Sequence, residues 1–184
     1  GCLMSINRYK NSELLLKRAL ETIPLGSQTF SKSITQYPRG VSPLFVTHGK
    51  GSHIWDVDGN EYIDMVMGCG PVTIGHKHPV IDDAIRAQLD KGILYSMLHP
   101  LEVEVAEKLV DCIPYAEMVK FSKNGSDVCA AAVRLARHVR GRNKIFCWGY
   151  HGFHDWYVAS TDRNAGIPSQ MKDLTKTFEY GDAD

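Results

Sequence analysis

Residues 116–127 read Ala-Glu-Met-Val-Lys-Phe-Ser-Lys-Asn-Gly-Ser-Asp. Residues 116–121 predict a short strand, residues 126–140 predict a helix, and Lys144-Ile-Phe-Cys147 predicts a second strand. A strand, a helix and a strand in this order make a βαβ unit, which implies a parallel sheet covered by helices. The sequence therefore predicts an α/β fold.

The region upstream of this unit starts with a predicted amphipathic helix over residues 11–20, with Ser12 as its candidate N-cap. Residues 24–43 are rich in Ser, Thr, Gln, Gly and Pro, which predicts a long ordered loop or a linker. Short strands are predicted at residues 44–47, 52–56 and 61–64. The Asp58-Gly59 pair between the last two is a strong hairpin signal, so we expect a small antiparallel sheet.

Two further helices are predicted over residues 79–91 and 100–112, where a proline precedes apolar residues at helical spacing. We expect their apolar side chains to face inward. The chain then divides into residues 1–75, with the N-terminal helix, the loop and the small sheet, and residues 76–184, the first part of a larger domain. Because a parallel sheet of only two strands has open edges, we expect more of the sheet to follow residue 184.

Composition narrows the class of partner. The 184 residues carry 21 basic and 21 acidic side chains, so no net charge draws the chain to nucleic acid or to an anionic membrane, and a small metabolite fits better. The five cysteines are scattered, odd in number and never in a CxxC pair, which argues against disulfides and a zinc knuckle and favours a reducing cytoplasm. No apolar run approaches the roughly 20 residues of a membrane span.

The junction between the predicted strand and helix contains Asn124, Gly125 and Ser126. Glycine allows close backbone approach, the serine adds a hydroxyl, and the first helical N–H groups favour an anion such as phosphate. An ordinary Asx turn, with Ser126 or Asp127 as the N-cap, explains the same residues. The GxxxxGK spacing of a P-loop is absent.

Tyr150, His151 and Gly152 follow the second predicted strand and should lie at the same carboxyl edge of the sheet, where α/β proteins bind ligands. An aromatic ring there is suited to stacking on a flat cofactor. A half-buried surface tyrosine is the alternative interpretation of Tyr150.

Paired histidines and loop cations are further candidates for binding residues. A metal-dependent hydrolase would use the imidazoles of His76, His78, His151 and His154. HExxH and GxSxG motifs are absent, so we predict no metal site and no serine nucleophile. The cations in loops could bind a carboxylate or phosphate or could be solvated; they are Lys32, Lys123 and Arg39.

Taken together, four ordered motifs resemble the class III aminotransferases, especially the branch that includes glutamate-1-semialdehyde aminomutase. The motifs are Trp55-Asp-Val-Asp-Gly-Asn-Glu-Tyr-Ile-Asp64, Gly75-His-Lys-His-Pro79, Asn124-Gly-Ser-Asp127 and Tyr150-His-Gly152. The resemblance implies a homodimer with the fold-type I, aspartate aminotransferase-like architecture and a pyridoxal 5'-phosphate (PLP) cofactor. It implies that Gly125 and Ser126 bind the phosphate, with Asn124 and His151 beside it, and that Tyr150 packs on the pyridine ring.

Two functional residues of that family have no counterpart in the motifs of this chain. They are the Schiff-base lysine and the aspartate that pairs with the pyridine nitrogen, which both come later in the family. Lys172 and Lys176 come too early to be assigned. We therefore expect an amino-terminal portion that is inactive alone, with its catalytic residue unknown.

Departures from the aminomutase pattern bear on the substrate. Gly68-Cys69 replaces a serine-tryptophan pair before Gly70-Pro71, and Lys32 stands where an arginine binds the substrate carboxylate. A lysine does not reproduce a bidentate fork. We expect an aminotransferase that uses a small amino donor and a ketone or aldehyde acceptor, with sugars among the candidates. An aminomutase and a catalytically dead binding or assembly module stay open as alternatives.

Overall fold

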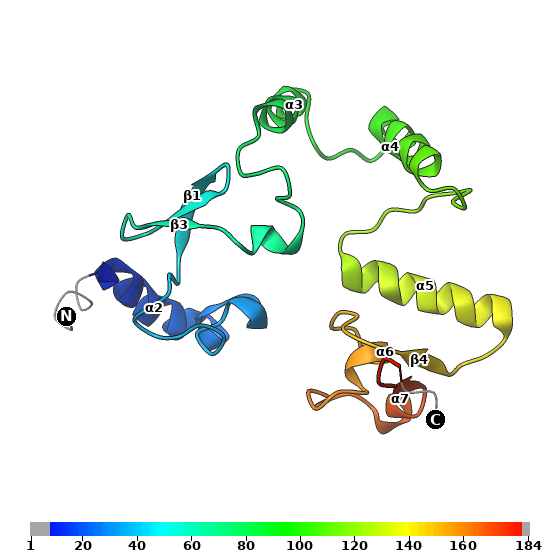
Figure 1. The fold of residues 1–184 in the computed structure, drawn as a ribbon. Helices are drawn as coiled ribbons and strands as arrows, with labels where there is room; N and C mark the ends of the chain where they lie inside the picture. Colours follow the sequence, from blue (N-terminus) through cyan, green and yellow to red (C-terminus); the bar gives the residue numbers. More distant parts are fainter. Residues whose placement is uncertain (1–7, 182–184) are drawn as a thin grey trace. The chain divides into compact units, whose positions relative to one another are not determined.

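The computed structural model describes residues 8–181, and the chain divides into two compact units, Gly1–Ser96 and Met97–Asp184 (Figure 1). The predicted boundary after residue 75 concerns the start of the cofactor domain and stays a prediction. Among residues 8–181, no helix combines the length and the apolar content needed to cross a membrane.

The first unit opens with helix α2, Lys10–Thr22, whose N-terminus is capped from a distant turn. Ser12 lies within the helix and is fully buried, so the prediction that it caps the helix is wrong. The carboxylate of Asp58 instead accepts hydrogen bonds from the backbone N–H groups of Asn11 (2.6 Å) and Ser12 (2.9 Å). An anion at this end satisfies N–H groups that have no partner inside the helix.

The predicted antiparallel sheet is confirmed, with the order β1-β2-β3. Its strands are β1 (Val46–Lys50), β2 (His53–Asp56) and β3 (Glu61–Ile63). The buried Asp56 organises the turn between β2 and β3, because its carboxylate accepts bonds from the N–H groups of Asp58 (3.0 Å) and Asn60 (2.8 Å). It also accepts bonds from the Asn60 side chain (2.9 Å) and the Tyr62 hydroxyl (2.8 Å).

The loop between α2 and β1 is ordered rather than a linker. It contains two short 3₁₀ turns, η1 (Pro24–Gly26) and η2 (Phe30–Lys32). The guanidinium of Arg39 donates two hydrogen bonds, of 3.0 and 2.7 Å, to the carboxylate of Glu13 on α2. Arg39 therefore ties the loop to the helix.

Helices α3 (Pro79–Leu89) and α4 (Pro100–Cys112) form close to where the sequence predicts them. The prediction that their apolar side chains face inward holds only in part, since Val80 is 72% and Val105 46% exposed whereas Leu109 and Val110 are half-buried. Helices bury an apolar face only against another element. Within the described residues, neither helix packs broadly on one.

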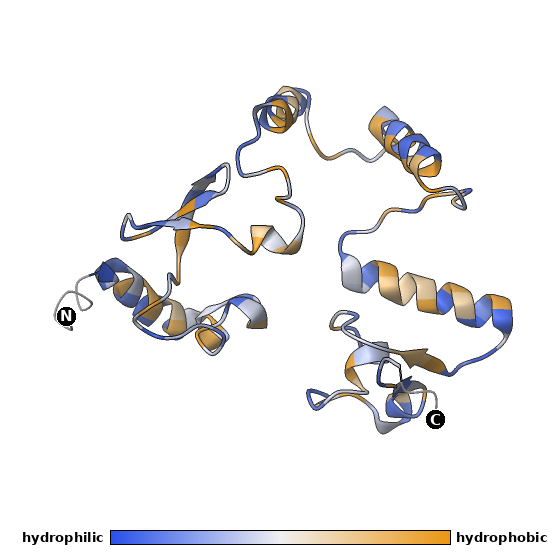
Figure 2. Ribbon diagram, in the orientation of Figure 1, coloured by the Kyte–Doolittle hydropathy of each residue, from blue (hydrophilic) through white to orange (hydrophobic). Residues whose placement is uncertain are grey.

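The second unit contains α5 (Gly125–Arg140), β4 (Ile145–Cys147) and β5 (Thr175–Thr177), with the short helices α6 (Asp155–Val158) and α7 (Ser169–Lys172) between the strands. Strands β4 and β5 pair in parallel, with Ile145 opposite Thr175. Figure 2 shows β4 as a hydrophobic strand, and its Cys147 packs with Trp156 and Tyr157 in the core of this unit. Parallel strands are therefore present, as predicted, but the partner of β4 is β5.

The strand predicted at residues 116–121 does not form. These residues pair with no strand among the described residues, and Met118 is 93% exposed. A strand is stabilised by a hydrogen-bonded neighbour, and here the neighbour of β4 is β5 instead. The parallel crossover therefore runs through α6 and α7, and α5 precedes its first strand.

Candidate cofactor-binding site

The two motifs that the sequence placed at one sheet edge meet in the structure, where the start of α5 packs against the turn that follows β4. The Ser126 hydroxyl accepts a hydrogen bond from the Phe153 N–H group (3.2 Å). Gly152, with φ +99°, lies so close to Ser126 that an added Cβ would stand 2.7 Å from the Ser126 Cβ. The glycine is therefore needed for contact between the two segments.

The first turn of α5 offers backbone donors. Asn124, rather than Ser126 or Asp127, is the N-cap, and its side chain accepts a bond from the Asp127 N–H group (3.0 Å). Within the described part of the chain, the N–H groups of Gly125 and Ser126 have no hydrogen-bond partner. A Cβ added at Gly125 would meet nothing within 4 Å. Unpaired donors at an open helix N-terminus suit an anion.

An ion pair makes a second link between α5 and the turn. The imidazole Nε2 of His154 lies 3.2 Å from Oδ1 of Asp127. The motifs did not predict this pair, although His154 and Asp127 each lie two residues after a glycine of the two motifs. This contact joins the turn after β4 to the first turn of α5.

Tyr150 and His151 differ in exposure and in anchoring. The Tyr150 ring is 80% exposed, which leaves it accessible for stacking. The Nε2 atom of His151 donates a hydrogen bond to the Trp148 carbonyl oxygen (2.7 Å), which leaves Nδ1 as the acceptor of the neutral ring. The turn thus presents one exposed aromatic ring and one tethered imidazole.

Lys32 belongs to the first unit. It lines a cavity of about 680 Å³ together with residues of the α2–β1 loop and of the small sheet. Neighbouring polar and aromatic side chains in that lining are Tyr37, Tyr62 and Asp64. The role of Lys32 in substrate binding stays a prediction.

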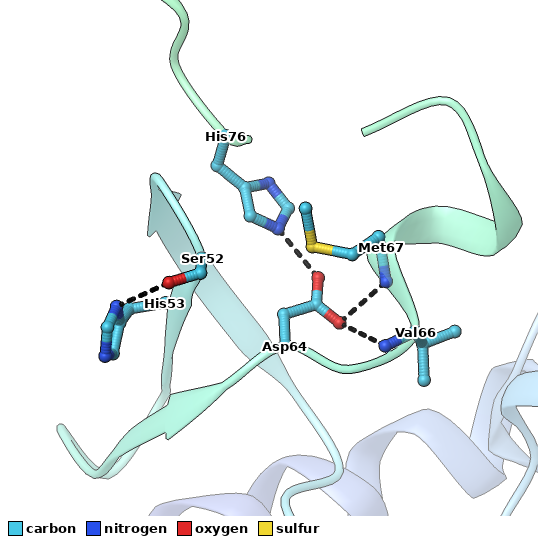
Figure 3. A network of polar contacts seen from close by, with 6 residues as sticks. All are labelled: Ser52, His53, Asp64, Val66, Met67 and His76. Carbon is cyan, nitrogen blue, oxygen red and sulfur yellow. Dashed lines mark hydrogen bonds and ion pairs between the residues drawn. The ribbon is translucent and has the colours of Figure 1, made fainter. Parts of the chain in front are cut away.

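Asp64, which lines the same cavity, is the centre of a polar network (Figure 3). One carboxylate oxygen lies 2.8 Å from His76 Nε2, and the other accepts bonds from the N–H groups of Val66 and Met67, both at 3.0 Å. The hydrogen bond with His76, followed by the one from Met67, lowers the pKa of Asp64 from its ordinary value. The network fixes the chain that leads into the 3₁₀ turn η3, Met67–Cys69.

The Asp64 network should make stability depend on pH. Because the folded pKa of Asp64 is lowered, its contribution is complete above the pKa of the unfolded chain, about 3.9, and is lost as pH falls through the lower folded value. We expect Asp64→Asn to cost about 1–3 kcal/mol at neutral pH. The unfolding free energies of wild type and variant should approach each other as the pH falls below about 4. Asp83→Asn, at an exposed carboxylate, is the control, and a difference that persists at low pH would contradict the assignment.

The histidines weighed as metal ligands have carboxylate partners in two cases, His76 with Asp64 and His154 with Asp127. These two pairs lie in different units. Among residues 8–181, no group of three or more His, Cys, Asp or Glu side chains could hold a metal ion.

Comparison with known proteins gives strong sequence matches. A family model described as Aminotransferase class-III matches residues 36–183. The 3-aminobutyryl-CoA aminotransferase of Cloacimonas acidaminovorans (strain Evry) is 38% identical over 178 residues, which are 96% of this chain and 42% of that protein. The glutamate-1-semialdehyde 2,1-aminomutase of Desulfitobacterium hafniense (strain DSM 10664 / DCB-2) is 37% identical over 78% of this chain and 36% of that protein.

Solved structures match in the same way. The FumI protein of Sphingopyxis sp. MTA144 has a TM-score of 0.84 and 32% identity over 95% of this chain and 41% of its own. An omega-transaminase from Sphaerobacter thermophilus has a TM-score of 0.83 and 26% identity over 94% of this chain and 43% of its own. The chain spans less than half the length of the relatives that it matches.

Proposed function

Because the chain belongs to the class III aminotransferase family, we propose that the protein is a PLP-dependent aminotransferase that moves an amino group to a ketone or aldehyde of a small metabolite. The matches to solved structures confirm the predicted fold-type I architecture. The two relatives described above are named for different compounds, one of them an acyl-CoA, so we propose a broad range of acceptors that includes sugars.

The observation that carries this proposal is the contact between the start of α5 and the turn after β4. The unpaired N–H groups of Gly125 and Ser126 would bind the phosphate of PLP, and the open space at Gly125 leaves room for it. The exposed ring of Tyr150 would stack on the pyridine face. PLP, when bound, supplies an electron sink for the amino-transfer chemistry.

The residues around this site would hold the cofactor and the substrate in place and would take no part in the reaction themselves. Asn124 caps α5 and so keeps its first N–H groups aligned, while His151 is tethered to the Trp148 carbonyl beside Tyr150. Lys32 would bind an anionic group of the substrate as a point charge. The lysine that binds the cofactor covalently is not assigned to any residue of this chain.

We propose this activity for the protein expressed from its complete reading frame, since the matched relatives are more than twice as long as this chain. We also propose a cytoplasmic homodimer. Among the described cysteines, the free thiols fit a reducing compartment; they are Cys69, Cys112, Cys129 and Cys147. Cys2 lies outside the described residues.

Trapping the cofactor tests the enzyme proposal directly. The protein expressed from its complete reading frame is mixed with PLP, reduced with borohydride and digested. We expect a cofactor label on one lysine, found by mass spectrometry. A protein that traps no label would instead be a binding or assembly module that keeps the fold without the chemistry.

An aminomutase is the second candidate, favoured by the 37% identity to the aminomutase of D. hafniense. The two activities differ in their need for a second substrate. An aminomutase converts glutamate-1-semialdehyde without an added amino donor or acceptor, whereas an aminotransferase turns over continuously only with both. Product analysis with the semialdehyde alone therefore separates them.

A further inference from the structure

The turn after β4 is poorly covered, yet it carries the ring that would stack on the cofactor. Trp148 is 52% and Tyr150 80% exposed, and the backbone bends through Gly149 with φ +82° and Gly152 with φ +99°. Glycines with positive φ leave the backbone broad freedom. The orientation of Tyr150 must therefore depend on a few anchoring contacts.

Tyr157, on α6, provides one of these anchors from within the core. It is only 8% exposed and packs with Cys147 and Trp156. Its hydroxyl donates a hydrogen bond to the Gly149 carbonyl oxygen (2.8 Å). Burial raises the pKa of Tyr157, so the phenol stays protonated and keeps its donor at neutral pH.

The ring of Tyr157 also contacts the two residues that follow Gly149. It stands edge-on to the Tyr150 ring, with centroids 5.9 Å apart and planes at 89°. It stands edge-on to His151 as well, at 5.4 Å and 89°. Edge-to-face pairs of this kind prefer a particular relative orientation of the rings. One buried side chain thus contacts three consecutive residues of the turn.

We propose that Tyr157 is a positioning residue, which holds the Tyr150 ring in the orientation that stacks on PLP. The stacking part of this inference rests on the proposed function, and the orienting part does not. Tyr157 acts through Tyr150 and the Gly149 carbonyl and touches no reacting atom. A purely structural tyrosine would affect the stability of the unit without affecting the ring of Tyr150.

The test uses the protein expressed from its complete reading frame. It combines one measurement made without the cofactor and one made with the cofactor bound. Tyr150 is replaced by 3-fluorotyrosine, and its fluorine NMR signal is recorded without PLP in wild type, Tyr157→Phe and Tyr157→Leu. The affinity for PLP and the visible circular dichroism of the bound cofactor are then measured for the unlabelled proteins. Tyr115→Phe, at a tyrosine that is 89% exposed, is the matched control.

Tyr157→Phe keeps the ring and loses the hydrogen bond. We expect it to shift the fluorine signal toward that of an unfolded chain. It should also weaken PLP binding roughly three- to tenfold, as the loss of one hydrogen bond predicts. Tyr157→Leu should have a larger effect on both, and Tyr115→Phe should match wild type. The circular dichroism band should weaken in the same order.

Each contrary result has a separate meaning. A fluorine signal unchanged in both Tyr157 variants overturns the positioning role. A changed signal with unchanged PLP affinity overturns the link to stacking and leaves the proposed function intact. A wild-type protein that binds no PLP overturns the proposed function, and the fluorine signal then still decides whether Tyr157 orients Tyr150.

Discussion

Replacing Gly152 with alanine is expected to destabilise the second unit by about 2–5 kcal/mol and to weaken PLP binding by about tenfold or more. The positive φ of +99° costs an alanine about 1–2 kcal/mol. The new methyl group would lie 2.7 Å from the Ser126 Cβ and 2.9 Å from its Cα, so backbone must move at a cost of about 1–3 kcal/mol. The movement would separate the turn from the N–H groups proposed to bind phosphate.

Gly166→Ala is the matched control for this variant. Gly166 also has a positive φ, +81°, but an added Cβ meets nothing within 4 Å. It should therefore show the backbone cost alone, with PLP affinity unchanged. Equal unfolding free energies and equal affinities for the two variants would mean that the close contact with Ser126 is unimportant.

Replacing Asp56 with alanine should have the largest effect on the first unit, about 3–4 kcal/mol. The Asp56 side chain accepts hydrogen bonds from two backbone N–H groups, an amide and a phenol, and the residue is only 2% exposed. Removal of the carboxylate leaves buried donors unsatisfied. It also frees the turn that carries Asp58, so the cap on α2 should be lost as well.

Hydrogen exchange measures this effect separately in α2 and in the small sheet. We expect amides of both to exchange faster in Asp56→Ala. Asp83→Ala is the control, because its carboxylate is 74% exposed and pairs only at the surface with Arg86, which is worth little. Faster exchange in the sheet but not in α2 would show that Asp58 holds the helix independently of Asp56.

Local patterns predicted much of the fold. Helices α3, α4 and α5 and the small antiparallel sheet were predicted within a few residues. Their signals, which are proline starts, helical spacing and an Asp-Gly turn, lie in residues close together in the sequence. The meeting of Asn124–Ser126 with Tyr150–Gly152 was also predictable. The prediction placed both motifs after parallel strands of one sheet. It reached the right contact although only one of those two strands, β4, forms.

What the sequence did not predict depends on partners distant in the chain. Strand β5 consists of Thr-Lys-Thr, without an apolar pattern. Its Thr175 is buried, and the Thr175 hydroxyl donates a hydrogen bond to the Trp156 carbonyl oxygen. The roles of Asp58 and Tyr157 likewise come from tertiary contacts. The strand expected at residues 116–121 failed for the same reason, since strand propensity does not supply a neighbour.

The cap on α2 has a consequence for the order of folding. Asp58 lies 47 residues from Asn11, so the first turn of the helix gains its cap only after the β2–β3 hairpin has formed and a long loop has closed. Short isolated helices are marginal in water, and loop closure costs chain entropy. The hairpin should therefore belong to the folding nucleus, with the N-terminus of α2 and the loop that carries Lys32 docking late.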